Sequence, residues 1–229
     1  MKIDDQRIAY AVAHTEVLRP PKQTLASFGN TSIRYFLLTQ PSYSEFVKES
    51  DDIVIREGRV IAEKPKVVTP TYLINLDGFG DNAKRYFQTL ATEDGPHSPG
   101  ILYQYRNQPK DLSIVSGNIM SVVARIENEI KEDPLTAIIQ GVDDLWDVSL
   151  LKFIRDLTSR SMLSNITELG GNGLVSVDSS GVTGDARQRI DGMFRAVKMD
   201  MEDPTRLKKE LDTWGIFHEY EDKFLDLFR

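Results

Sequence analysis

The sequence predicts an α+β protein, with a mixed, largely antiparallel sheet in its first part and a mainly helical portion after it. Short runs of branched and aromatic residues, typical of strands, dominate the first hundred residues. Apolar residues at helical spacing dominate the chain after Asp147, and a strand-helix-strand pattern links the two regions. We therefore expect a mixed-sheet domain over residues 1–144 and a helical portion over residues 145–229 that packs on it.

Strands are predicted first at residues 7–18, which alternate weakly between apolar and polar side chains, and at residues 32–39, which read SIRYFLLT. Residues 53–56 and 59–62 flank a Glu-Gly pair, which is a hairpin signal. Residues 66–69 lie next to prolines and are expected to form an edge or irregular segment. These segments predict a largely antiparallel sheet.

The middle of the chain adds a helix and a candidate βαβ unit. Asp81 is placed to cap a helix of about three turns that ends before Gly95. Residues 112–115 then form a short apolar run, a turn follows at residues 116–118, and helical spacing leads to a second apolar run at residues 135–139. The sequence thus predicts one βαβ unit inside the sheet.

The helical portion carries clear signals at helix ends. Asp147 can cap a first helix, and Asp203 followed by Pro204 caps a later one. Gly215 is placed to end that helix in a left-handed conformation, with Ile216 in contact with the preceding turn.

Composition limits the classes of function. The net charge of −7 opposes non-specific nucleic-acid binding, and zero cysteines exclude thiolate metal sites and disulfides. The three histidines are scattered, so oxygen ligands would have to hold a metal. No apolar run approaches the roughly 20 residues that span a bilayer, and the acidic N-terminus does not resemble a secretory signal. We expect a cytoplasmic protein with no membrane contact.

The acidic turn after the second strand of the βαβ unit is the candidate metal site. Asp143 and Asp144 could hold Mg²⁺ together with a substrate phosphate, to which the turn at Ser116 and Asn118 could offer backbone N–H groups. Parallel strands would bring both turns to the carboxyl edge of the sheet, and the two would converge if the strands are neighbours. Asp77, in a glycine-containing loop, is a further candidate ligand-binding residue. Turn preference and helix capping also account for these residues.

The C-terminus is the candidate protein interface. Six large apolar residues fall in the last thirteen, and five of them are expected on a helix face that must be covered by the fold or by a partner. Four of them are predicted to contribute to a two-fold interface in a homodimer: Phe217, Tyr220, Phe224 and Phe228.

These features leave two functional hypotheses. No Walker A string, G-x-G-x-x-G, G-x-S-x-G or H-E-x-x-H motif occurs, which favours a soluble, non-catalytic interaction or regulatory protein without a cofactor. The alternative is a Mg²⁺-dependent enzyme that acts on a phosphorylated small molecule or nucleotide at the edge marked by Ser116 and Asp143.

Overall fold

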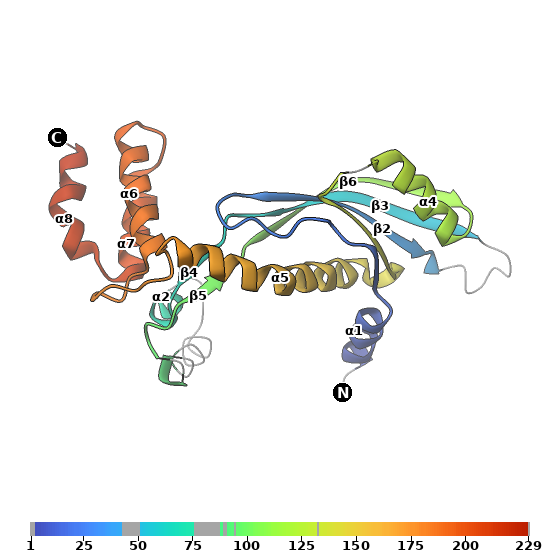
Figure 1. The fold of residues 1–229 in the computed structure, drawn as a ribbon, viewed down its shortest axis with the longest axis horizontal. Helices are drawn as coiled ribbons and strands as arrows, with labels where there is room; N and C mark the ends of the chain where they lie inside the picture. Colours follow the sequence, from blue (N-terminus) through green and yellow to red (C-terminus); the bar gives the residue numbers. More distant parts are fainter. Residues whose placement is uncertain are drawn as a thin grey trace. The chain divides into compact units, whose positions relative to one another are not determined.

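The computed structural model describes residues 3–42, 51–75, 88, 91–93, 95–131 and 133–228. The chain divides into two compact units, one formed by Met1–Lys64 with Tyr103–Asn165 and the other by Pro65–Leu102 with Ile166–Arg229 (Figure 1). The expected boundary near Asp144 falls within the first unit, just before its long helix.

The first unit contains a mixed five-stranded sheet, so the α+β class predicted from the sequence is confirmed. Its strands in spatial order are β1 (Glu16–Arg19), β7 (Thr136–Val142), β2 (Thr31–Gln40), β3 (Asp52–Ala62) and β6 (Tyr105–Ser116). Only β2 and β7 pair in parallel; the other three neighbouring pairs are antiparallel. The sheet is largely antiparallel, as the sequence indicates.

The βαβ unit is present as β6, α4 (Ile119–Ile130) and β7. β6 is antiparallel to β3, β3 to β2, and β2 is parallel to β7, so β6 and β7 run in the same direction. They are not neighbours, because β3 and β2 lie between them. The Asn118 side chain caps α4 by accepting a hydrogen bond from the Ser121 N–H at 2.9 Å.

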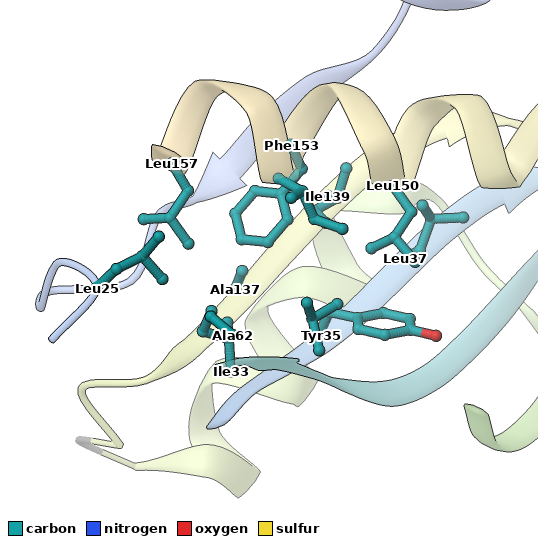
Figure 2. Close-up of a cluster of buried hydrophobic side chains, with 12 residues drawn as sticks. Leu25, Ile33, Tyr35, Leu37, Ala62, Ala137, Ile139, Leu150, Phe153 and Leu157 are labelled. Carbon is teal, nitrogen blue, oxygen red and sulfur yellow. The ribbon is translucent and has the colours of Figure 1, made fainter. Parts of the chain in front are cut away.

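Each face of the sheet is covered by one helix, because successive side chains along a strand point to opposite faces. Tyr35 and Leu37 of β2 face α5 (Trp146–Gly171), and Figure 2 shows Leu150 and Phe153 of that helix directed at them and at β7. Phe36 and its neighbours on the other face pack against α4. A short 3-10 turn, η2 (Asp143–Leu145), connects β7 to α5.

The N-terminal strand prediction is wrong for most of its length. Ile3–Ala13 form helix α1, and only β1 remains of the strand expected over residues 7–18. Ile8 and Tyr10 are exposed while Ala11 is fully buried, so the helix packs through a small residue. The apolar residues that produced the alternating pattern therefore do not mark one buried face of a strand.

The predicted hairpin at Glu57 and Gly58 is also wrong, because β3 continues through both residues. Opposite this point β6 has an irregular register: Glu57 pairs with Asp111 and Gly58 with Pro109, which leaves Lys110 as an extra residue. Such a bulge bends and twists the strand that carries it. The glycine thus belongs to a strand at a bulge, and not to a turn.

The second unit is mainly helical. It contains the strand pair β4 (Lys66–Val68) and β5 (Gly100–Leu102) and the helices α2 (Pro70–Ile74), α6 (Gly184–Lys198), α7 (Pro204–Trp214) and α8 (Phe217–Leu225), followed by the 3-10 turn η3 (Asp226–Phe228). Its core includes Ile190, Phe194 and Leu207, all at most 2% exposed. Most of the helix predicted after Asp81 lies outside the described residues; residues 88 and 91–93 are helical.

The helix ends of this unit confirm the sequence signals. Asp203 caps α7, with its carboxylate accepting from the Thr205 N–H at 2.8 Å. Gly215 has φ = 70°, and the Ile216 N–H donates to the Leu211 carbonyl at 3.0 Å, which is the bond of a Schellman motif. α5, by contrast, begins at Trp146, one residue before its predicted cap Asp147.

Candidate functional site

Asp143 and Asp144 lie at the carboxyl end of β7, as predicted, but their carboxylates are held by protein groups. Asp143 Oδ1 accepts a hydrogen bond from Thr39 Oγ1 at 2.7 Å and forms an ion pair with Arg56 at 2.8 Å. Asp144 is more exposed and accepts a hydrogen bond from Ser42. Arg56 therefore places a positive charge at the position where a metal ion was expected to bind.

The predicted partners of these carboxylates lie elsewhere. The turn at Ser116 and Asn118 emerges at the same edge of the sheet, but β2 and β3 separate it from Asp143 by three strand spacings, about 14 Å. Ser116 donates to Asp52 at 2.9 Å, and Asn118 caps α4. Asp77 lies outside the described residues. The structure thus brings Asp143 and Asp144 together but not the Ser116 turn.

Among the residues that the structure describes, no group of three or more histidines and carboxylates is placed to hold a metal ion. The metal site stays a prediction. A metal ion at Asp143 and Asp144 would need further ligands that are not histidine or carboxylate side chains of the described residues.

The contacts of Asp143 shift its protonation. Burial raises the pKa of this carboxyl group, but hydrogen bonds from Thr39 and Arg56 and the charge of Arg56 lower it by more, so the pKa lies below its usual value. A lowered pKa stabilises the fold above the usual aspartate value of about 3.9, and this stabilisation is lost as the pH falls through the lowered pKa.

We expect Arg56→Met to move the pKa of Asp143 upward, so that the acid-induced loss of stability begins at a higher pH than in the unmodified chain. An NMR titration of the Asp143 carboxyl carbon, with urea unfolding at several pH values, measures both effects. Arg59→Met, which changes an exposed arginine of the same strand, is the matched control. An unchanged Asp143 pKa in Arg56→Met would contradict the prediction.

The four predicted interface aromatics pack mostly within their own unit. Phe224 is 8% exposed, its ring lies edge-on to Phe217, and Tyr220 stacks on Phe194. Phe228, at 64% exposed, is the one of the four that remains largely open to solvent. The expectation that not all four are covered within one chain fits this arrangement, while the dimer itself stays a prediction.

The sequence did not single out β6 as a site. Its 12 residues form an edge of the sheet, and within the described residues no strand pairs with its outer side. Leu112 and Ile114 are 58% and 54% exposed. The apolar run at residues 112–115 predicts this strand as part of the βαβ unit, but it carries no signal of an exposed edge.

A hollow of about 470 Å³ lies beside this edge, on the face of the sheet that α5 covers elsewhere. Tyr35, Arg56, Leu112 and Trp146 are among its lining residues, and the Arg56 guanidinium carbon lies 5.7 Å from the centre of the Trp146 ring. The hollow therefore combines aromatic surface with two cations, Arg56 and Lys110, which already pair with Asp143 and Glu57.

Helices of the described chain do not combine the length and the apolar character needed to cross a membrane. No protein-family model, curated protein or solved structure matches this chain.

Proposed function

We propose that this chain is an interaction or regulatory protein that binds a protein partner through the outer edge of β6. The observation that carries the proposal is that β6 is a long edge strand with exposed apolar side chains. An edge strand presents backbone N–H and C=O groups that pair with an added strand, and natural proteins usually protect such edges.

The edge strands of this sheet differ in how well they are protected against pairing with an added strand. The opposite edge strand, β1, has only four residues and an irregular register. The first half of β6 contains Pro109, which lacks an N–H donor, and the bulge at Lys110. Residues 112–116, which read Leu-Ser-Ile-Val-Ser, contain no proline, charge or register shift. This uncharged half is the segment of β6 that is open to pairing.

The hollow beside the edge supplies a place for a partner side chain. In strand addition, main-chain hydrogen bonds provide affinity and side-chain pockets provide specificity. Leu112 lines this hollow together with Tyr35 and Trp146, so an apolar or aromatic side chain of the added strand would gain contacts there. The C-terminal aromatics have less support as the main contact surface, because three of the four pack within their own unit.

A fluorescent synthetic peptide that copies residues 105–116 tests the proposal. Titrated with the full chain, it is expected to show saturable binding by anisotropy, and Ile114→Lys in the protein is expected to weaken binding at least about tenfold, or 1.4 kcal/mol. Met120→Lys, at a residue of α4 that is 65% exposed, is the matched control and should bind normally. Absence of saturable binding, or equal loss in both variants, would overturn the proposal.

A further inference from the structure

The open half of β6 is complementary to itself. We infer that the partner added at this edge is a second copy of the chain, paired antiparallel about a two-fold axis at Ser113, so that the two sheets become one. This inference rests on the proposed function above, and it specifies the occupant and the register. A two-fold interface uses the same patch on both subunits, so the strand must match its own reverse.

Apolar pairing supports this register. With Ser113 opposite Ser113 of the partner subunit, Leu112 of each copy lies opposite the partner's Ile114, and directly opposed residues share a face of the sheet. Leu112 and Ile114 already lie on one face, because they pair with Arg56 and Val54 of β3. Their four exposed side chains would therefore cover one another on a continuous surface.

The charged residues at the two ends of the paired segment are compatible with this register. Lys110, which pairs with Glu57 of its own chain at 2.8 Å, lies opposite the partner's Ser116, whose hydroxyl donates to Asp52 at 2.9 Å. Asp111 lies opposite an uncharged valine. No like charges are opposed, and opposed like charges are the arrangement that destabilises strand pairs.

Other positions of the two-fold axis do not pair Leu112 with Ile114. An axis centred at Leu112 places Ile114 opposite Lys110 of the partner subunit. An axis centred at Ile114 places Leu112 opposite the partner's Ser116. A centre between Lys110 and Asp111 would pair their opposite charges, but it brings Pro109 and the bulge into the middle of the ladder. Only the centre at Ser113 places both exposed apolar residues, Leu112 and Ile114, opposite apolar residues of the partner subunit.

The absence of cysteine from the chain allows a direct test by cross-linking. Ser113→Cys introduces a single thiol that meets its own copy across the two-fold axis, where opposed Cβ atoms are about 4.5–5.5 Å apart. Mild oxidation is expected to produce a disulfide-linked dimer rapidly. Gln108→Cys, on the same strand but outside the paired segment, is the matched control and should cross-link slowly. Equal rates for the two variants would overturn the register.

Sedimentation equilibrium of the full chain measures the association itself. We expect a mass of twice 26.0 kDa for the unmodified chain and for Met120→Lys, and a monomer for Ile114→Lys. Since Ile114 is 54% exposed, circular dichroism should show that Ile114→Lys keeps the fold. A monomer at tens of micromolar, or a dimer that Ile114→Lys does not affect, would overturn the inference.

The peptide titration separates this inference from the proposed function. If the peptide binds while the full chain remains monomeric, the edge accepts strands but a second copy is not its partner. If the peptide does not bind and the chain remains monomeric, both proposals fail.

Discussion

Arg189→Met is expected to destabilise the second unit by about 3–5 kcal/mol, because it removes a guanidinium that pairs with two poorly exposed carboxylates. Arg189 Nη1 donates to Asp185 Oδ2 at 2.6 Å, and Nη2 donates to Glu210 Oε1 at 2.8 Å. The Asp185 and Glu210 side chains are only 2% and 14% exposed.

Neutral donors also contact these carboxylates. The Val67 N–H donates to Asp185 at 3.1 Å, and Trp214 Nε1 and the Tyr72 hydroxyl donate to Glu210 at 3.1 Å and 3.3 Å. Neutral donors orient a carboxylate but do not supply the opposite charge, so they compensate only part of the loss. Because these contacts join β4, α6 and α7, the whole helical unit is expected to lose stability.

Urea unfolding of Arg189→Met and of the unmodified chain gives the difference in unfolding free energy. Arg195→Met changes an exposed arginine of the same helix and is expected to alter stability by no more than about 0.5 kcal/mol. If the two variants were equally stable, the ion pairs of Arg189 would contribute nothing beyond those of a surface arginine.

Local sequence signals predicted the parts of the fold that depend on neighbouring residues. Helical spacing over α4, the cap at Asp203 and the left-handed glycine at position 215 all reflect contacts within a few residues of each other. The mixed sheet and its βαβ unit also followed from local patterns. The order of the strands did not, because pairing depends on contacts between distant segments.

This limitation explains the position of β6. An apolar run at residues 112–115 predicts a strand of a βαβ unit, but it does not indicate whether that strand is central or at an edge of the sheet. In the structure β2 and β3 lie between β7 and β6, and β6 is left at the edge. The same run thus indicated a strand correctly but not its exposure.

At the candidate site, too, local sequence patterns predicted the position of residues but not their contacts with distant segments. Asp143 and Asp144 were identified because carboxylates follow a buried strand, and both do lie at its end. Arg56, which pairs with Asp143, is contributed by β3 and carries no local sequence signal for that contact. The ion pair between Arg56 and Asp143 depends on the pairing of distant strands, so local sequence patterns do not indicate it.

Gly58→Ala is expected to destabilise the first unit by about 1–3 kcal/mol through overpacking. A Cβ atom at this position would lie 2.6 Å from Tyr35 Cζ and 2.9 Å from the Gln108 carbonyl oxygen, and closer still to Tyr35 Oη. Tyr35 is 1% exposed and its hydroxyl donates to Asn107 at 3.1 Å, so its ring cannot move aside freely. Urea unfolding measures the loss, and Gly29→Ala, where the added Cβ meets nothing within 4 Å, is the control in the same unit.

A double-mutant cycle with Tyr35→Leu separates the two obstacles to that Cβ. Leucine lacks the far end of the ring, so Gly58→Ala should cost less in the Tyr35→Leu background, with only the Gln108 carbonyl left in the way. An equal cost in both backgrounds would show that the backbone at the bulge sets the requirement for glycine. A cost no greater than that of Gly29→Ala would mean that the contact between β3 and Tyr35 is not tight. The cycle therefore measures the interaction free energy between position 58, opposite the β6 bulge, and Tyr35 on the buried face of the sheet.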